Sequence, residues 1–136
     1  MTERTFVIVK PDAVAAGLVG DILGRYERAG LRLVALQQRT IDDAFADRHY
    51  HEHVAKSFYP TLREFMTSGP LIAGVLAGPD AVAIARQVNG ATDPAQAEPG
   101  TIRADHGTSV TINCVHASDA PQTAASEIAL WFPNLA

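Results

Sequence analysis

Cysteine is almost missing from this sequence of 136 residues, since Cys114 is the only one. A single thiol cannot close an intrachain disulfide, and it cannot supply the thiolates of a structural zinc site. Long apolar runs are missing as well: no segment approaches the roughly 20 apolar residues of a transmembrane helix, and the N-terminus lacks the apolar stretch of a signal peptide. We therefore expect no membrane partner and a soluble, unprocessed protein of the reducing cytoplasm.

An excess of basic residues is also lacking. The chain has 11 Lys and Arg against 15 Asp and Glu, and its formal net charge is -4. Without an overall basic field the chain has no charge to hold a nucleic-acid backbone, so nucleic acid is not a predicted partner. An anionic ligand must instead meet a local group of cations. The 47% of hydrophobic residues suffice for one core, and we expect a single domain over residues 1–136.

Ready-made phosphate cradles are missing too. The sequence has no Gly-Lys-Ser/Thr loop, and Gly17, Gly20 and Gly24 do not have the spacing of a dinucleotide fingerprint. It offers scattered cations instead, with Lys10 after a predicted strand and Arg86 near the end of a predicted helix. Each of them alone is typical of a solvated surface charge, so only their convergence in space would make a site.

The hydrophobic pattern predicts strands that alternate with helices. Strands are expected at 5–9, 31–38, 71–77 and 110–115, and helices at 19–29, 80–88 and 121–131. Between the second and third strands, a helix from Asp42 or Asp43 towards His53 and a second one around 62–66 predict a helical hairpin. The long connection between Gly90 and Ser109 has no clear period, and such loops are often functional. By itself, the alternation favours a doubly wound parallel sheet.

The segment from Asn113 to Asp119 places a histidine, His116, between the last predicted strand and the last helix. A helix N-terminus attracts anions, and histidine titrates near neutrality, so it can act as a nitrogen nucleophile. The alternative is an incidental histidine at a helix start, and residue type alone favours that alternative.

The histidines allow two other interpretations, a metal site and a hydrolase triad. His49, His51 and His53 suggest a metal site, but two imidazoles on one helical face need a third ligand, and a polar helix surface is the stronger interpretation. Ser118 and Asp119 complete the residue types of a hydrolase triad with the nearby histidine. They are crowded together in the sequence, and no Gly-x-Ser-x-Gly elbow accompanies them.

Five separated motifs along the chain favour a functional role for His116 over an incidental histidine. They are Lys10-Pro11-Asp12, Thr67-Ser68-Gly69-Pro70, Gly90-Ala91-Thr92-Asp93-Pro94, Pro99-Gly100-Thr101-Ile102-Arg103 and Asn113-Cys114-Val115-His116-Ala117-Ser118-Asp119. Together they resemble the nucleoside diphosphate kinase family, from about Glu3 to Phe132.

The resemblance implies an α+β fold in place of the parallel sheet. It is a ferredoxin-like βαββαβ core with a four-stranded antiparallel sheet, an inserted helical hairpin and a long loop before the last strand. It also implies a homo-oligomer, either a hexamer or a tetramer.

The implied reaction is a ping-pong transfer of the γ-phosphoryl group from nucleoside triphosphates such as ATP and GTP to diphosphates such as ADP and GDP. His116 would carry the group, and base identity would matter little. Mg²⁺ would be held by the nucleotide phosphates and not by protein side chains. The residues that match the family's catalytic pocket are His116, Glu127, Ser118 and Tyr50, and those that match its nucleotide-binding set are Lys10, Phe58, Arg86, Thr92, Arg103 and Asn113.

Some positions depart from the family's usual pattern. Ala117 replaces the common glycine after the histidine, and Ala104 and His106 replace a frequent glycine and aromatic. Ser57 stands where a proline often occurs, and Asp93 replaces an asparagine. The alternative function is a nucleotide-binding regulatory homologue with little or no turnover, and the retention of the matched polar residues argues against it.

Overall fold

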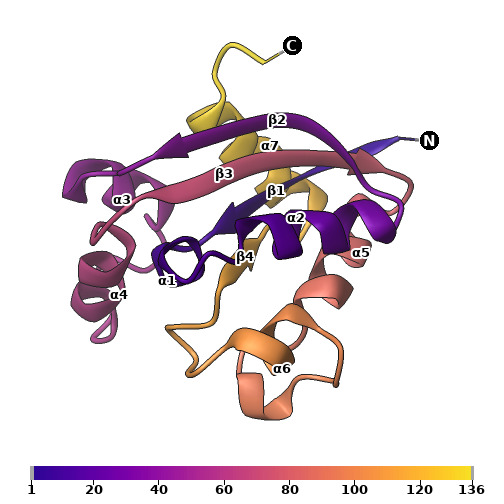
Figure 1. The fold of residues 1–136 in the computed structure, drawn as a ribbon. Helices are drawn as coiled ribbons and strands as arrows, with labels where there is room; N and C mark the ends of the chain where they lie inside the picture. Colours follow the sequence, from indigo (N-terminus) through magenta and orange to yellow (C-terminus); the bar gives the residue numbers. More distant parts are fainter. Residues whose placement is uncertain (1, 136) are drawn as a thin grey trace.

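The computed structural model describes residues 2–135 and has a four-stranded sheet at its centre. The strands are β1 (Glu3–Val9), β2 (Arg32–Arg39), β3 (Leu71–Gly78) and β4 (Val115–Ala117), in the order β2-β3-β1-β4 (Figure 1). Every neighbouring pair is antiparallel. The α+β fold with an antiparallel sheet is therefore confirmed, and the parallel sheet that simple alternation favours is wrong.

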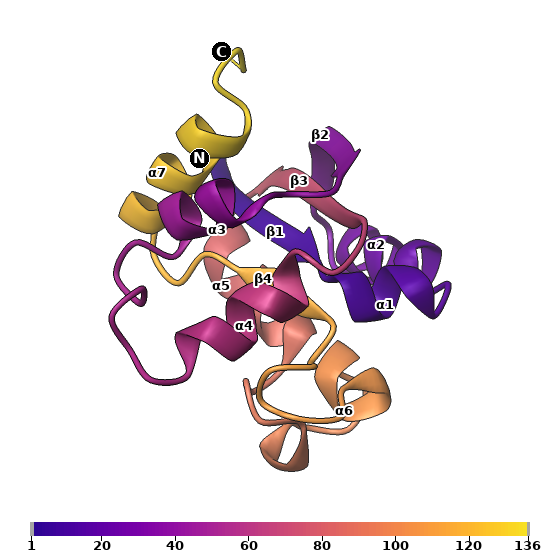
Figure 2. The same ribbon diagram turned by 90° about the vertical axis from the view of Figure 1, so that its left-hand side faces the viewer.

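Helices cover both faces of the sheet (Figures 1 and 2). Alternate side chains of β1 enter two separate cores: Val7 and Val9 pack in one, and Phe6 and Ile8 in the other. The first core includes residues of α1 (Pro11–Ala15), α2 (Val19–Arg28) and α5 (Ala81–Asn89), and the second includes residues of α3 (Asp43–His49), α4 (Tyr59–Met66) and α7 (Pro121–Trp131). None of the helices in the described part of the chain has the length and apolarity needed to cross a bilayer.

The predicted helix ends have the expected local chemistry. The Asp42 side chain accepts a hydrogen bond from the Phe45 N–H at 2.8 Å and caps α3. Gly90 follows α5 with a φ of +87°, and a Cβ there would lie 2.5 Å from Thr101 Oγ1. Both the left-handed backbone and the close approach of the long loop therefore require glycine at the end of α5.

The fourth strand is shorter and later than the sequence predicts. The expected strand at 110–115 is wrong, because β4 spans only Val115–Ala117. Before it, the Ile112 carbonyl accepts from the Thr108 N–H at 2.9 Å, and the Ser109 hydroxyl accepts from the Ile112 N–H at 3.0 Å. These bonds close a local turn in a segment whose β-branched residues have strand propensity. As a result, His116 lies inside the strand.

Two further boundaries differ from the pattern. The helix expected to run towards His53 ends at His49, and the chain then continues in turns to Phe58. His49 and His53 therefore do not share a helical face. The long connection before β4 contains the short helices η1 (Pro94–Gln96) and α6 (Ile102–His106), which form a lobe away from the sheet (Figures 1 and 2).

A buried hydrogen bond joins the two long helices of the first face. The Tyr26 hydroxyl on α2 donates to the Asn89 side-chain oxygen at the end of α5, and both residues are almost completely buried. We expect Tyr26→Phe to lower the free energy of unfolding by about 1–3 kcal/mol, because it leaves a buried acceptor without its donor. Urea denaturation measures the change. The double variant Tyr26→Phe/Asn89→Leu should lose less unfolding free energy than the sum of the losses in the two single variants. If the urea midpoint of Tyr26→Phe equals that of the wild type, the hydrogen bond adds no stability.

Candidate active site

A cavity of about 890 Å³ opens beside β4 and is lined from several elements. Its walls include His49 at the end of α3, Phe58 before α4, Arg86 on α5 and Glu127 on α7. Its volume is in the range of pockets that enclose a small-molecule ligand. Segments far apart in the sequence therefore meet in one site.

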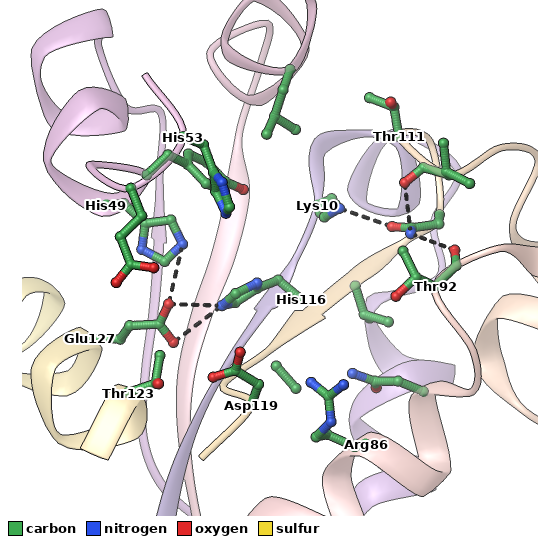
Figure 3. Close-up of a pocket in the computed structure, with 18 of the residues that line it drawn as sticks. Lys10, His49, His53, Arg86, Thr92, Thr111, His116, Asp119, Thr123 and Glu127 are labelled. Atoms are coloured by element: carbon green, nitrogen blue, oxygen red, sulfur yellow. Dashed lines mark hydrogen bonds and ion pairs between the residues drawn. The ribbon is translucent and has the colours of Figure 1, made fainter. Parts of the chain in front are cut away.

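His116 lies in this cavity with one ring nitrogen tied to a carboxylate. Its backbone is paired opposite Ile8 in the sheet, and its side chain is 22% exposed. The Nε2 atom lies 3.2 and 3.1 Å from the two carboxylate oxygens of Glu127 (Figure 3). Because a carboxylate only accepts hydrogen bonds, Nε2 carries the proton of the neutral ring, and Nδ1 keeps a free lone pair. The ring is therefore oriented with the Nδ1 lone pair directed away from Glu127.

Glu127 is ionised although it is largely buried. Burial alone would raise the pKa of this carboxyl group, but the hydrogen bond and charge of His116, with contributions from His49 and Ser118, hold the pKa below its usual value. The Ser118 hydroxyl donates directly to the same carboxylate. The carboxylate is thus kept as an acceptor for the histidine ring.

The backbone that leads into His116 is strained. Cys114 has a φ of +76°, and the Val115 N–H donates to the Asn113 carbonyl at 2.9 Å, so the three residues form a γ-turn. Such backbone costs about 1–3 kcal/mol and persists only where neighbours hold it. Here the Lys10 N–H donates to the Cys114 carbonyl at 2.8 Å, and Arg103 donates to the Val115 carbonyl at 2.7 Å.

Three cationic residues line the cavity, namely Lys10, Arg86 and Arg103. The Lys10 ammonium donates to the Asn113 side-chain oxygen at 2.9 Å, and burial, helped by repulsion from Arg103, lowers the pKa of this lysine to about 8. Within residues 2–135, three buried polar nitrogens of the lining residues have no hydrogen-bond partner: Nε of Arg103, Nδ2 of Asn89 and Nδ1 of His53. A wall with positive charge and unused donors is suited to an anionic ligand.

A second histidine, His49, is buried behind the first. Its Nδ1 atom accepts the indole N–H of Trp131 at 3.0 Å, and its Nε2 atom lies 3.6 Å from Glu127 Oε2. Burial, followed by repulsion from His116, lowers the pKa of His49 to about 3. This ring is therefore neutral at any pH at which the protein works.

His49, His116 and Glu127 also form a set of potential metal ligands, whose ligand atoms lie within 4.8 Å of one another. Two imidazoles with a carboxylate suit zinc better than Mg²⁺, which prefers oxygen ligands. The indole of Trp131 already occupies Nδ1 of His49, so the neutral ring keeps its proton on Nε2, where a metal would bind. The set is therefore not preorganised for a metal ion.

Comparison with known proteins identifies the family. A family model described as nucleoside diphosphate kinase matches residues 3–136. A nucleoside diphosphate kinase of a Nocardioides species is 58% identical over 135 residues, which cover 99% of this chain and 100% of that protein. The chain belongs to the nucleoside diphosphate kinase family. Another relative, from Rhodococcus jostii, is 57% identical over 137 residues and carries the same name, with 100% of this chain and 99% of that one covered.

Solved structures of the nucleoside diphosphate kinase family have the same fold. The enzyme from Aquifex aeolicus superimposes with a TM-score of 0.94 at 41% identity, covering 97% of this chain and 96% of that one. The enzyme from Encephalitozoon cuniculi gives a TM-score of 0.93 at 39% identity, with 96% and 88% covered. The helical hairpin and the long loop of this chain are thus part of a fold that is shared along almost its whole length.

The structure brings the sequence-predicted site residues together. All of them but Ser118 line the one cavity, namely Lys10, Tyr50, Phe58, Arg86, Thr92, Arg103, Asn113, His116 and Glu127. Ser118 is fully buried behind the cavity wall and acts on it through its bond to Glu127.

Sequence reasoning missed His49 and Trp131. The prediction of a polar helix surface at His49 is wrong, because its side chain is only 1% exposed. A usable signal was present: His49 follows Phe45 by four positions and Ala46 by three, which is the spacing of a buried helix face. Val110 was missed as well, and it lines the cavity although it is 59% exposed.

The departures from the family pattern lie around the site and leave its donors in place. His106 Nε2 lies 3.2 Å from Asp21 on α2, in a surface pair of the kind that contributes little stability. Asp93 accepts from the Ala95 N–H at 3.0 Å and caps η1. Ala117 is buried within β4, and Ser57 is exposed before Phe58.

The buried neutral state of His49 makes folding sensitive to acid. The unfolded chain binds a proton at this histidine below the ordinary pKa of 6.5, whereas the folded state binds it only near pH 3. Stability is therefore unaffected by this group above pH 6.5 and decreases as the pH falls towards 3. We expect His49→Gln to reduce that loss by up to about 1.4 kcal/mol per pH unit. Urea titrations between pH 7 and 4 measure it, with the exposed His51→Gln as control; equal slopes in the wild type and His49→Gln would contradict the expectation.

Proposed function

We propose that this chain transfers the γ-phosphoryl group of a nucleoside triphosphate to a nucleoside diphosphate through phosphohistidine 116. The observation that carries the proposal is the bond from Nε2 of His116 to Glu127, which leaves the Nδ1 lone pair free beside a cationic cavity. Nδ1 attacks the γ-phosphorus, the bond from that phosphorus to the β-phosphate oxygen breaks, and the diphosphate leaves. A second diphosphate then attacks the phosphohistidine in reverse.

Glu127 supports both half-reactions. When the nitrogen–phosphorus bond forms, the ring becomes cationic, and the adjacent carboxylate stabilises that charge while it holds the Nε2 proton. When the acceptor takes the group, the ring returns to its neutral form with the same proton. No proton has to be transferred from the ring in either direction.

The cationic wall suits the triphosphate. Phosphoryl transfer spreads negative charge over the equatorial oxygens, so fixed positive donors perform most of the catalysis. Arg86, Arg103 and the Thr92 hydroxyl line the cavity, and we assign them to the phosphates. Lys10 and Asn113, which are bonded to each other, are assigned to the sugar hydroxyls.

The mouth of the cavity suits any base. Phe58 is 52% exposed, and Leu62 and Val110 line the same cavity. Stacking on an aromatic ring depends on the π-face that all bases share, whereas a hydrogen-bonded base edge would discriminate between them. We therefore assign Phe58 as the stacking platform of an enzyme with broad base specificity.

Mg²⁺ fits this arrangement as part of the nucleotide. The predominantly cationic surroundings of the phosphates favour an ion bound by phosphate oxygens over one held in a protein cage. Asp119 also lines the cavity and presents a carboxylate there. When bound, Mg²⁺ would neutralise phosphate charge.

The alternative is a regulatory homologue that binds nucleotides with little turnover. Such a protein has no need of a histidine whose Nε2 is fixed and whose Nδ1 is free. It also has no need of a second hydrogen-bond donor to the Glu127 carboxylate, such as the Ser118 hydroxyl. The geometry around His116 therefore favours turnover.

We also propose that the single domain of residues 1–136 acts as a homo-oligomer in the cytoplasm. β2 is an edge of the sheet, and Leu36 on this strand is 49% exposed. Unpaired edges are commonly covered by another chain, so a second copy of this chain is the natural partner for β2. The one buried cysteine is compatible with a reducing compartment.

Labelling with γ-³²P ATP tests the reaction. The wild type should acquire an acid-labile, alkali-stable label that ADP or GDP removes. His116→Ala should lower exchange by on the order of 10⁴-fold or more, because no other side chain replaces the nucleophile. The control is His106→Ala, which removes a histidine outside the cavity and should label normally.

The competing outcomes are distinct. ATP binding by the wild type without any label would support the regulatory homologue, and labelling of His116→Ala would place the nucleophile elsewhere.

Phe58→Ala tests the stacking platform. Base–aromatic stacking is worth about 1–3 kcal/mol, so KM should rise about 5- to 150-fold and by similar factors for adenine, guanine and pyrimidine nucleotides. Steady-state kinetics with several nucleotides measure the change. Val54→Ala is the matched control, because Val54 is an exposed apolar residue of the same loop outside the cavity wall. A rise in KM confined to one base would show that Phe58 selects bases.

A further inference from the structure

His49 is a buried titratable group that the proposed reaction does not use. We infer that His49 is a positioning residue: the indole of Trp131 fixes the tautomer in which His49 directs its Nε2–H at Glu127, and this holds the Glu127 carboxylate against His116. The inference rests on the proposed function, because it assigns His49 a role in the phosphoryl transfer by His116.

The packing around His49 leaves its ring little freedom. The side chain is 1% exposed and lies between the sheet, α3 and α7. Its ring centroid lies 4.5 Å from that of Tyr50, 5.0 Å from that of His116 and 5.5 Å from that of Trp131, in edge-to-face contacts. Figure 3 shows His49 and His116 both directed at the same carboxylate.

Trp131 determines which nitrogen of His49 carries the proton. An indole N–H can only donate, and it points at Nδ1 of His49 from 3.0 Å. Nδ1 must therefore accept, and the proton of the neutral ring is on Nε2. This N–H faces Glu127 Oε2 at 3.6 Å, which is an electrostatic contact longer than a full hydrogen bond. Catalytic hydrogen bonds are often long in the free enzyme and shorten in the reacting complex.

The surroundings of His49 keep its ring neutral. It faces His116 from β4, Glu127 from α7, Lys10 from the end of β1 and the neighbouring His51. Burial keeps the ring neutral, and a protonated His116 would repel a second charge beside it, so His49 does not compete with His116 for the proton. Its contribution is a directed N–H dipole of constant strength.

Three donors thus converge on one carboxylate: His116 and Ser118 come from the end of β4, and His49 comes from the end of α3. With the His49 donor removed, Oε2 of Glu127 keeps His116 as its remaining partner, and the carboxylate is less restrained against rotation relative to that ring. A displacement of about 1 Å in such a group can cost on the order of 10²-fold in rate.

Two substitutions of His49 separate positioning from packing. His49→Gln retains an N–H that can reach Glu127, whereas His49→Leu has a similar volume and no donor. We expect His49→Leu to lower the single-turnover rate of His116 phosphorylation about 10- to 100-fold with nucleotide affinity unchanged, and His49→Gln to restore most of that rate. The acid limb of the kcat/KM profile should move to higher pH in His49→Leu only, because a carboxylate with fewer donors holds the proton on His116 more tightly.

A second measurement does not depend on turnover. In ¹⁵N NMR of the wild type, His49 should be the Nε2–H tautomer, and Trp131→Phe should convert part of it to the Nδ1–H form while the fold is retained. If His49→Leu does not fold, Trp131→Phe tests the positioning role in its place. We then expect the single-turnover rate of His116 phosphorylation to fall several-fold.

The outcomes distinguish the two proposals. Absence of labelling in the wild type would overturn the proposed function and leave the tautomer assignment standing. A labelled wild type with equal rates and equal pH profiles in His49→Leu and His49→Gln would overturn the positioning role alone, as would an Nδ1–H tautomer in the wild type.

Discussion

The bond between Nε2 of His116 and the carboxylate of Glu127 is the interaction on which the site depends. It determines which nitrogen is free to react, and it keeps a negative charge where positive charge develops on the ring. Much of the surrounding structure serves this contact. Antiparallel pairing with β1 fixes the backbone of His116, and α7 carries Glu127 on the same face of the sheet as the His116 side chain. The carboxylate remains ionised because its donors outweigh the cost of its burial.

The approach of the chain to this contact requires strained backbone. The γ-turn at Cys114 places the Asn113 side chain beside Lys10 and the next two residues in the sheet. A non-glycine residue at positive φ is unfavourable in isolation, and here hydrogen bonds from Lys10 and Arg103 hold it. Lys10 and Arg103, which we assign to the nucleotide, thus also hold the backbone beside His116. The same residues would therefore support both nucleotide binding and the position of His116.

Much of the fold and of the site could be predicted from the sequence. The capped helices and the buried strands follow from local patterns, as the Asp42 cap and the burial of Ile22 and Tyr26 show. The antiparallel order could not be obtained from alternation, because it depends on pairings between distant segments; the family motifs supplied it. The cavity then gathers residues that the family resemblance named one by one.

The errors have physical causes. Val110 and Ile112 have strand propensity, but hydrogen bonds from Thr108 and to Ser109 close a turn there. His49 was assigned to the surface because a polar residue type was given more weight than its spacing from Phe45 and Ala46. Its partner Trp131 lies 82 positions away in the sequence, and no local pattern can show such a contact.

One cavity in the described structure contains both His116 and the residues assigned here to the nucleotide, and this limits what the molecule can do. On the proposed mechanism, donor and acceptor must occupy the same space in turn, bound by the same side chains. The two half-reactions are then mirror images with nearly equal energies, and no step drives the cycle in one direction. Such a catalyst cannot create a surplus of any one triphosphate. It can only bring the phosphorylation ratios of all the nucleotides that it accepts to a common level.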